Sequence, residues 1–288
     1  MTKRVAITIF FCFLIGAVPA IAAKDTESRD IASKTDDGWQ KLAAGLELGV
    51  FRSPQPSEIG DSMIRVLRID TDHFKLRLLN ASVSKNGSSL STKDWCLQNG
   101  LVAAINASMF QADYKSSVSL MRTKAHVNNP RLSKDMTILA FDRRSSDVPR
   151  VKIIDRQCDD FNNWKSKYET FIQSIRMISC TGKNVWSPQP RKWSTAAIGI
   201  DYRNRVMFIH VGSPYSTHDL INILQALPLG IARAMYVEGG PQAQLYINIG
   251  GHEYEFVGGY KIDLEENVNS FFSRPIPNAV GISLRGDK

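Results

Sequence analysis

The 288-residue sequence is poor in the residue types that build metal sites and disulfide-rich folds. It has four cysteines and five histidines, and no two histidines are spaced as H-x-H or H-x₃-H. We therefore expect no structural zinc and assign no metal ligands and no cofactor, while dependence on a divalent metal stays open. The sequence also lacks an internal repeat and a linker rich in Gly, Pro or Ser. These absences exclude a repeat protein and disfavour a tandem-domain arrangement.

A single long apolar run occurs, and it lies at the N-terminus. Lys3 and Arg4 precede the apolar stretch Val5–Val18, and Ala20-Ile21-Ala22 has the small residues of a cleavage site. This order is typical of a cleaved signal peptide over residues 1–23. The chain is then expected to be exported, periplasmic or secreted, in a bacterium, with no membrane span after cleavage.

The charge balance is moderately basic. The formal net charge is +8, and losing Lys3 and Arg4 with the leader leaves about +6. Such a protein tends to meet anionic partners. The basic residues are scattered and are not interleaved with aromatics, so we expect a phosphorylated glycan rather than nucleic acid. A basic character that only aids solubility is the alternative.

Three cysteines remain after the leader: Cys96, Cys158 and Cys180. The odd number allows one internal disulfide and one free thiol. Cys158 and Cys180 flank a segment with helical spacing and are the more plausible pair.

The stretch Ala234–Ile249 is the most informative part of the sequence for a functional site. Its apolar start predicts a buried strand that ends at the acid Glu238. Gly239 and Gly240 then allow a sharp turn, and alternating polar and apolar residues predict a second strand. A carboxylate at a strand end, beside glycines that let a ligand approach the backbone, indicates a candidate catalytic site. A surface Glu in a β-hairpin is the alternative interpretation.

Residues 24–45 are expected to be a flexible lead-in, and 46–288 a single domain. Alternation predicts a hairpin from Ser62–Ile69 and His73–Leu79, and another from Thr195–Ile200 and Val206–Val211. Further strands are expected at Leu46–Arg52, Leu101–Ile105, Ser117–Arg122, Met136–Phe141, Gln173–Cys180, Tyr254–Val257 and Asn278–Leu284.

Three helices are expected. Ser91 or Thr92 caps one that ends at Gln98, and Ser216 or Thr217 caps another at His218–Leu227. Asp159–Ile172 has helical spacing, with aromatics that we interpret as core. Many strands, few helices and frequent hairpins predict an α+β fold with a mixed, largely antiparallel sheet.

Four ordered stretches resemble the phosphodiester glycosidase family, which includes the enzyme that uncovers mannose 6-phosphate on lysosomal proteins. They are Ile105–Phe110, Gln173-Ser174 with Met177, Ser194–Ile200 and Val237–Tyr246. The resemblance covers about Phe74 to Leu284, is similar to the exported bacterial branch, and implies hydrolysis of a sugar-1-phosphodiester. The chain departs from the family pattern where Ser108 replaces a glycine, Ile175-Arg176 replaces glycine-proline, and Glu238 replaces an aspartate.

Cleavage of a glycosyl phosphodiester requires stabilisation of positive charge at the anomeric carbon, an attacking group and a hold on the phosphate. With this resemblance, Glu238 is the candidate nucleophile or base, and Asn106 is its candidate catalytic partner. The remaining candidates are expected to bind substrate: Ser174, Arg176, Arg191, Thr195, His210, Gly239, Gly240 and Gln244. Arg176 and Arg191 suit a phosphate clamp because guanidinium matches phosphate geometry.

Each candidate also has a structural interpretation. Glu238 can accept hydrogen bonds from the N–H groups of the turn, and Asn106 can bond to nearby backbone groups. The arginines can simply be exposed on the surface, as most arginines are. Asn80, Asn86 and Asn106 each begin an N-x-S sequon, and a glycan on Asn106 would contradict its expected burial. The leading hypothesis is an exported hydrolase of envelope glycans or exopolysaccharide. The alternative is a catalytically impaired envelope protein of the same fold that binds a phosphorylated glycan.

Overall fold

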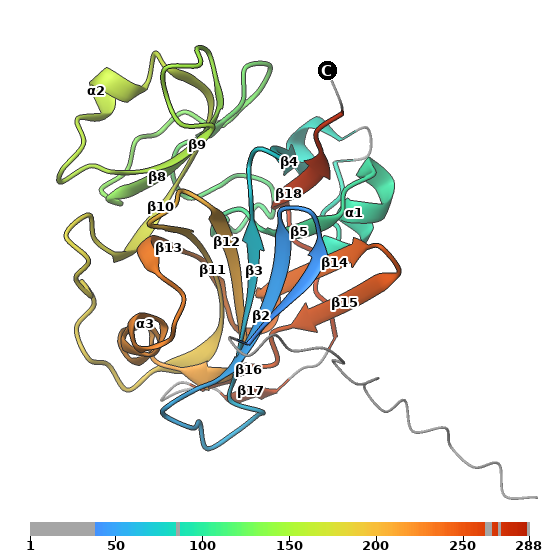
Figure 1. The fold of residues 1–288 in the computed structure, drawn as a ribbon, viewed down its shortest axis with the longest axis vertical. Coiled ribbons are helices and arrows are strands. Elements are labelled where there is room, and N and C mark those ends of the chain that lie inside the picture. The colour runs from blue at the N-terminus through green and yellow to red at the C-terminus, as the bar shows by residue number, and fades with distance from the viewer. Residues whose placement is uncertain (1–37, 85–86, 263–266, 270–271, 287–288) are drawn as a thin grey trace, which may run out of the picture. The chain divides into compact units, whose positions relative to one another are not determined.

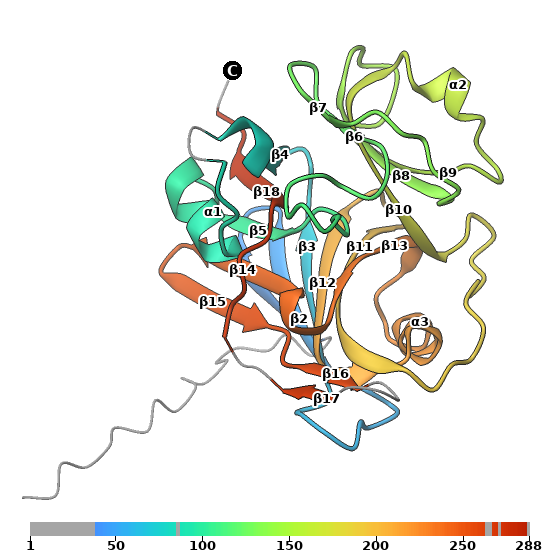
Figure 2. The same ribbon diagram turned by 180° about the vertical axis from the view of Figure 1, so that it is seen from behind.

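The computed structural model describes residues 38–84, 87–262, 267–269 and 272–286. The described strands form two sheets, and every pair of neighbouring strands is antiparallel. Figure 1 shows the larger sheet curving past α3, and Figure 2 shows the smaller sheet from behind. No helix in the described part of the chain is long and apolar enough to span a bilayer.

The larger sheet has the central order β1-β2-β3-β12-β11-β13-β10-β6-β7. Strands β8 and β9 join it through β10, and β16 and β17 join it through β11. Its strands are β1 (Trp39–Ala43), β2 (Leu46–Arg52), β3 (Met63–Ile69), β6 (Met121–Arg122), β7 (Val127–Asn129), β8 (Thr137–Arg143), β9 (Val151–Asp155), β10 (Tyr168–Ile178), β11 (Lys192–Asp201), β12 (Val206–Tyr215), β13 (Ile231–Gly239), β16 (Tyr260–Ile262) and β17 (Asn267–Asn269).

The smaller sheet has the order β15-β14-β5-β18-β4. Its strands are β4 (Phe74–Asn80), β5 (Ala103–Asn106), β14 (Gln244–Ile249), β15 (His252–Val257) and β18 (Asn278–Leu284). The helices are α1 (Thr92–Asn99), α2 (Phe161–Trp164) and α3 (Thr217–Ala226), with 3₁₀ turns η1 (Ala81–Val83) and η2 (Gly240–Gln242). Asn80, at the end of β4, is buried and donates to Asn278 Oδ1 at 2.7 Å.

The core lies on both sides of the larger sheet. One cluster joins inward residues of both sheets, for example Phe208 and Val237 with Leu245 and Val280. The second cluster packs α3 against the opposite side of β11, β12 and β13. The central strands are therefore covered on both sides, which explains their nearly continuous apolar sequences.

Local capping explains the helices that the sequence predicts. The side chain of Ser91 accepts from the Asp94 N–H at the start of α1, and Ser216 accepts from Asp219 N–H at the start of α3. The β11–β12 hairpin is confirmed, with its turn at residues 202–205. The strands expected near Leu46, Leu101, Met136, Tyr254 and Asn278 are also present.

The predicted hairpin of Ser62–Ile69 with His73–Leu79 is wrong. Strand β3 pairs with β2 on one edge and β12 on the other, so it has no edge left for β4. Strand β4 pairs instead with β18 in the smaller sheet. The turn after β3 therefore carries the chain from one sheet to the other.

The predicted helix Asp159–Ile172 is also mostly wrong. Only Phe161–Trp164 is helical, and β10 begins at Tyr168. Aromatic and β-branched residues favour strands, and pairing with β8 from Tyr168 to Ser174 overrides the helical spacing. The interpretation of the aromatics as core is confirmed for Tyr168 and Phe171, which are buried.

Two further expectations need correction. The segment 24–45, expected as a flexible lead-in, contains β1, which pairs with β2; its first residues to 37 lie outside the described part of the chain. The sheet is largely antiparallel as expected, but the described strands contain no parallel pair and the helical share is small. The fold is thus dominated by antiparallel β-structure.

Candidate functional site

Four segments that are far apart in the sequence meet at the end of β13. Ser108 Oγ, just after β5, donates to the carbonyl of Gln173 in β10 at 3.2 Å. Ser174 Oγ in turn donates to the carbonyl of Tyr236 in β13. Thr195 of β11 lies opposite Gly239 in the register of β11 and β13. These contacts bring the four family-like stretches of the sequence to one place.

Glu238 occupies this meeting point at a bulge in β13. Ala196 pairs with Glu238 and Ala197 pairs with Tyr236, so Val237 is the extra residue of the bulge. The carboxylate oxygen Oε1 accepts from the N–H of Gly239 at 2.9 Å. Burial raises the pKa of Glu238 to about 8, and this hydrogen bond offsets only part of that effect. Most Glu238 side chains are therefore protonated at pH 7.

The two glycines after Glu238 are required by their surroundings. A Cβ on Gly239 would overlap the Tyr236 hydroxyl and lie 2.7 Å from Cδ1 of Trp193. Gly240 has a φ of 63°, in the left-handed region that favours glycine. The chain therefore passes directly over two aromatic side chains as it leaves β13.

Tyr236 and Trp193 are functional candidates that the sequence reasoning missed. Burial raises the pKa of Tyr236 well above its usual range, and the nearby Glu238 charge adds to the rise. The buried Trp193 indole Nε1 lies beside the Tyr236 hydroxyl and partly opposes this rise, although the contact falls outside standard hydrogen-bond geometry. Tyr236 lies two residues before Glu238, and Trp193 lies two before Thr195. These sequence positions were the available signal. The bulge at Val237 breaks the alternation between Tyr236 and Glu238, but the edge-on contact of the Trp193 and Tyr236 rings places those two side chains on the same side of adjacent strands.

Asn106 holds the turn that follows Glu238. Its Nδ2 donates to the carbonyl of Gln242 at 2.9 Å, and its Oδ1 accepts from the N–H of Gln244 at 2.8 Å. The side chain is buried, with 1% of its surface exposed. Both ends of the amide are therefore bonded to backbone on either side of Ala243, which positions η2.

Of the two arginines expected to clamp phosphate, Arg176 is paired elsewhere. Arg176 Nη1 forms an ion pair with the fully buried Asp155 at 2.9 Å and also donates to Gln157 at 2.7 Å. A buried carboxylate needs such a countercharge, so Arg176 is committed to it. Arg191 is exposed and lies just before β11.

His210 is buried beside the smaller sheet. Its Nε2 lies 3.3 Å from the carbonyl of Ala243, and its ring stacks on Phe256. Burial, with a smaller contribution from Arg65, lowers the pKa of His210 to about 3. The ring is neutral near pH 7, so Nε2 carries a hydrogen and donates to that carbonyl. It therefore does not suit a proton carrier. His210 lines a separate cavity of about 280 Å³.

The other predicted residues have mainly structural contacts. Gln244 Oε1 accepts from Thr92 N–H and Ser273 Oγ, and its Nε2 donates to the carbonyl of Arg274. Ser174 is fully buried, and Thr195 is 1% exposed. Among the described residues, no group of three or more His, Cys, Asp or Glu side chains is arranged to hold a metal ion.

A disulfide joins Cys158, just after β9, to Cys180, just after β10, as the sequence favoured. Cys96 is free and buried in α1. The disulfide therefore ties the β8–β9 part of the sheet to the distal end of β10.

Comparison with known proteins identifies one matching family and several solved structures with a similar fold. The family model described as phosphodiester glycosidase matches residues 99–283. The catalytic domain of zebrafish N-acetylglucosamine-1-phosphodiester alpha-N-acetylglucosaminidase, auto-inhibited by its pro-peptide, has a similar fold. Its TM-score is 0.61 at 11% identity, covering 85% of this chain and 86% of that one.

A hypothetical protein from Synechocystis is also similar, with a TM-score of 0.54 at 12% identity. That match covers 84% of this chain and 62% of the other. At these identities both likenesses concern the fold. No curated protein sequence matches the chain significantly.

Proposed function

Because the chain belongs to the phosphodiester glycosidase family, we propose that it is an exported hydrolase that cleaves glycosyl phosphodiesters of envelope or extracellular glycans. The observation that carries this proposal is the convergence of four segments on Glu238, a partly buried carboxyl beside two close-packed glycines. The N-terminal signal-like segment and the Cys158–Cys180 disulfide support export, since disulfides persist in oxidising compartments.

In this proposal Glu238 acts in its ionised form, as nucleophile toward the anomeric carbon or as base toward water. Its raised pKa makes the carboxylate a stronger base than an exposed one. The bond broken joins the anomeric carbon to a phosphate oxygen. Phosphate leaves readily as an anion, so a strong general acid is not needed.

Neighbouring groups supply the supporting roles. The Trp193 Nε1–H and the Tyr236 hydroxyl, both close to Gly239, are the donors that we assign to substrate oxygens. Asn106 is a positioning residue, because it holds the backbone on the far side of the turn. We leave Arg176 out of the site, since Asp155 already pairs with it.

The test is turnover of hexose 1-phosphodiesters by the mature protein. A panel of α- and β-linked sugars with a methyl phosphate group is incubated with the protein, and released reducing sugar is measured. Glu238→Gln keeps the shape of the side chain and removes its charge. Glu58→Gln, on an exposed residue, is the matched control.

We expect turnover in the wild type and in Glu58→Gln, and a loss of about 10²- to 10⁴-fold in Glu238→Gln. Equal turnover in all three proteins would remove Glu238 from the mechanism. Binding without turnover across the whole panel would instead favour a catalytically impaired glycan-binding protein. That alternative is consistent with a carboxyl that is mostly protonated at pH 7.

A further inference from the structure

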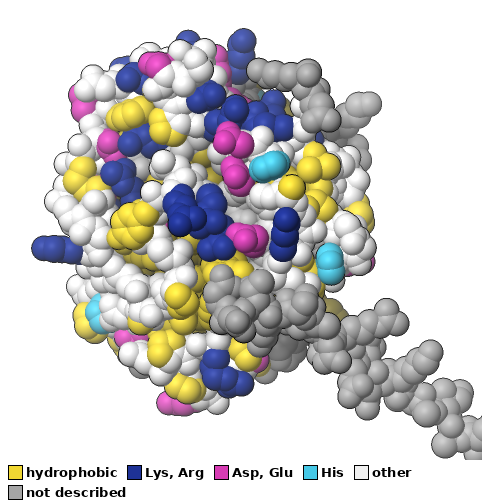
Figure 3. Space-filling view, viewed as in Figure 1, with side chains coloured by type: hydrophobic (Ala, Val, Ile, Leu, Met, Phe, Trp, Pro, Cys, Tyr) yellow, Lys and Arg dark blue, Asp and Glu magenta, His cyan; other side chains and the backbone are white. Residues whose placement is uncertain are grey.

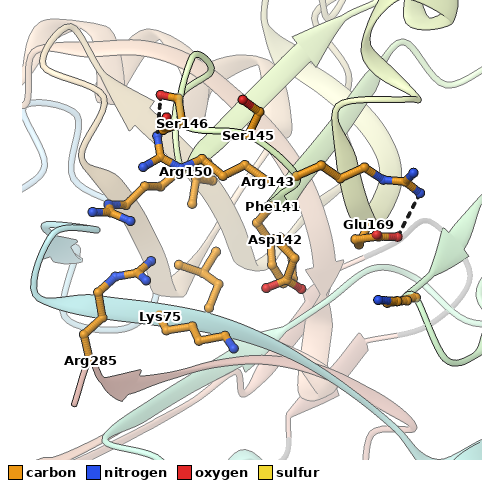
Figure 4. Close-up of a pocket in the computed structure, with 13 residues that line it drawn as sticks. Lys75, Phe141, Asp142, Arg143, Ser145, Ser146, Arg150, Glu169 and Arg285 are labelled. Carbon is orange, nitrogen blue, oxygen red and sulfur yellow. Dashed lines mark hydrogen bonds and ion pairs between the residues drawn. The ribbon is translucent and has the colours of Figure 1, made fainter. Parts of the chain in front are cut away.

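A basic cleft lies where the β8–β9 part of the larger sheet approaches β4 and the end of β18. Its volume is about 460 Å³, and its lining comes from five separate stretches of the chain. Figure 3 shows Lys and Arg side chains clustered on this face of the molecule, and Figure 4 shows the cleft itself. We name the basic cleft by its six cationic residues: Lys75, Lys124, Arg143, Arg144, Arg150 and Arg285.

Positive charge in the basic cleft exceeds negative charge. Only Asp142 and Glu169 among its lining residues are acidic. Glu169 pairs with Arg144 at 3.0 Å, and Asp142 accepts from the hydroxyl of Thr170 at 2.6 Å. The remaining cations therefore have little compensation from within the cleft.

Two of the arginines are held by neutral groups. Arg143 Nη1 donates to the carbonyl of Val148 at 2.6 Å, and Arg285 Nε donates to the carbonyl of Thr71 at 2.8 Å. Backbone carbonyls fix the direction of a guanidinium but do not neutralise it. The unused N–H groups of both side chains can still bind an anion in a bidentate way.

The other cations are also accessible. Arg150 pairs with Asp72, which is 76% exposed, so solvent screens this pair strongly. Lys75 is exposed and has no hydrogen bond or ion pair within the described residues. Figure 4 shows Lys75 and Arg285 across the opening from Arg143 and Arg150. The pKa of Arg285 is lowered by burial and by the charges of Arg150 and Arg143. The fold thus holds like charges close together, as in sites that bind anions.

The basic cleft continues into two neighbouring hollows. One, of about 560 Å³, shares Arg143 and Arg150 with it and adds Arg203, but Asp70 and Asp72 also line it and its Arg205 is paired with Asp201. The other, of about 720 Å³, shares Lys75, Arg150 and Arg285. Because Asp72 lines both hollows, the excess of positive charge is concentrated in the basic cleft itself.

We propose that the basic cleft binds the phosphate groups of a phosphorylated glycan chain, at a place built by β4, β8, the β8–β9 loop and the segment after β18. The choice of glycan rests on the proposed function, whereas anion binding stands on the cleft alone. Nucleic acid is disfavoured because Phe141, the aromatic residue of the lining, is 2% exposed and cannot stack on a base.

Direct binding tests this assignment without turnover. Mature Glu238→Gln protein is titrated with a phosphate-bearing mannan, with the same mannan after its phosphate is removed, and with a single-stranded DNA oligonucleotide. The cleft variant Lys75→Gln/Arg285→Gln is compared with Lys41→Gln/Lys183→Gln. The second pair changes the net charge equally at exposed residues that do not line the basic cleft.

We expect the cleft variant to weaken binding of phosphorylated mannan by about tenfold or more, and the control pair by less than about twofold. Binding should also weaken between 50 and 200 mM salt, as ionic contacts do. Equal weakening by both variants, or equal binding of the dephosphorylated mannan, would overturn the proposal. Cleft-dependent binding that favours DNA over mannan would replace the glycan with nucleic acid. Since Glu238→Gln removes catalysis in every titration, a failed hydrolysis assay leaves these outcomes unaffected.

Discussion

At the scale of single residues, the protonation of Glu238 governs the proposed chemistry. Burial raises the pKa of this carboxyl to about 8, so the ionised form that attacks or accepts a proton is a minority at pH 7. His210 lies two strands from Glu238, paired with Ala196, which in turn pairs with Glu238. Burial lowers the pKa of His210, so its ring stays neutral. Of these two groups, only Glu238 changes charge near physiological pH.

The first prediction concerns the pH dependence of activity. If Glu238 acts as a carboxylate, kcat/KM should rise about tenfold for each pH unit below 8 and level off above it. The measurement is reducing-sugar release at pH 5 to 9.5 by the wild type and by Glu58→Gln as control. A rate that is flat through pH 8, or that falls above it, would contradict a carboxylate role.

The second prediction concerns stability. The pKa of Glu238 is about 8 in the folded chain, against an unperturbed value of 4.5. Between these values the unfolded chain loses a proton that the folded chain keeps, so the free energy of unfolding falls as pH rises. Glu238→Gln should therefore gain stability relative to the wild type between pH 5 and pH 8, by at most a few kcal/mol. Urea unfolding of both proteins at pH 5 and pH 8 measures how much more stable Glu238→Gln is than the wild type. If this stability difference is the same at both pH values, the raised pKa is contradicted.

At the scale of helices and strands, local sequence signals predict an element correctly where one short segment determines it. They fail where pairing with a strand far away in the sequence determines it. Ser91 and Ser216 identify the starts of α1 and α3, because a capping side chain acts within its own turn. The position of β4 and the strand at Tyr168–Ile178 depend on partners far away in the sequence, β18 and β8. No local pattern carries that information.

The same distinction applies to the candidate site. The family resemblance made Asn106 the candidate catalytic partner of Glu238, and the hydrogen bonds of the η2 turn bring the two segments together. Arg176 matched a phosphate ligand only by residue type. Its pairing with Asp155, 21 residues away, depends on how β9 and β10 end. The sequence alone does not show which arginines form ion pairs with carboxylates in the folded chain.

The third prediction concerns the turn after Glu238. Asn106→Ala leaves the buried Gln244 N–H and Gln242 carbonyl without their partner, which should cost about 2–4 kcal/mol of stability. Displacement of the turn should also lower kcat more than it changes KM, since Asn106 is a positioning residue. Thermal unfolding and steady-state kinetics measure both effects.

Asn163→Ala is the matched control, because Asn163 is exposed and has no side-chain hydrogen bond within the described residues. It should shift stability by less than about 0.5 kcal/mol. If Asn106→Ala unfolds the protein, Asn106→Asp retains the acceptor to Gln244 N–H and isolates the loss of the donor. Wild-type stability and kinetics in both Asn106 variants would contradict the positioning role.

At the scale of the whole molecule, the two sheets share one apolar core. Phe208 and Val237 of the larger sheet belong to the same cluster as Leu245 and Val280 of the smaller one. Strand β10 and the Cys158–Cys180 disulfide connect the separate cluster around Tyr168 to this core. Neither sheet can bury its apolar side without the other.

The fourth prediction is therefore a single cooperative unfolding transition. Far-UV circular dichroism and tryptophan fluorescence should give coincident urea curves, because Trp39 reports on the larger sheet and Trp95 on the smaller one. Two separated transitions would show that the sheets unfold independently. Reduction of the disulfide should lower the midpoint without separating the curves.

The burial of Asn80 and Asn106 also bears on how the protein can be produced. Both asparagines begin sequons, and both side-chain nitrogens are occupied inside the folded chain by Asn278 and Gln242. An oligosaccharyltransferase modifies such residues while the chain is still being translocated, before these contacts exist. Secretion from yeast or insect cells should then yield glycoforms that cannot close the smaller sheet, whereas a bacterial host that lacks this enzyme should yield folded protein.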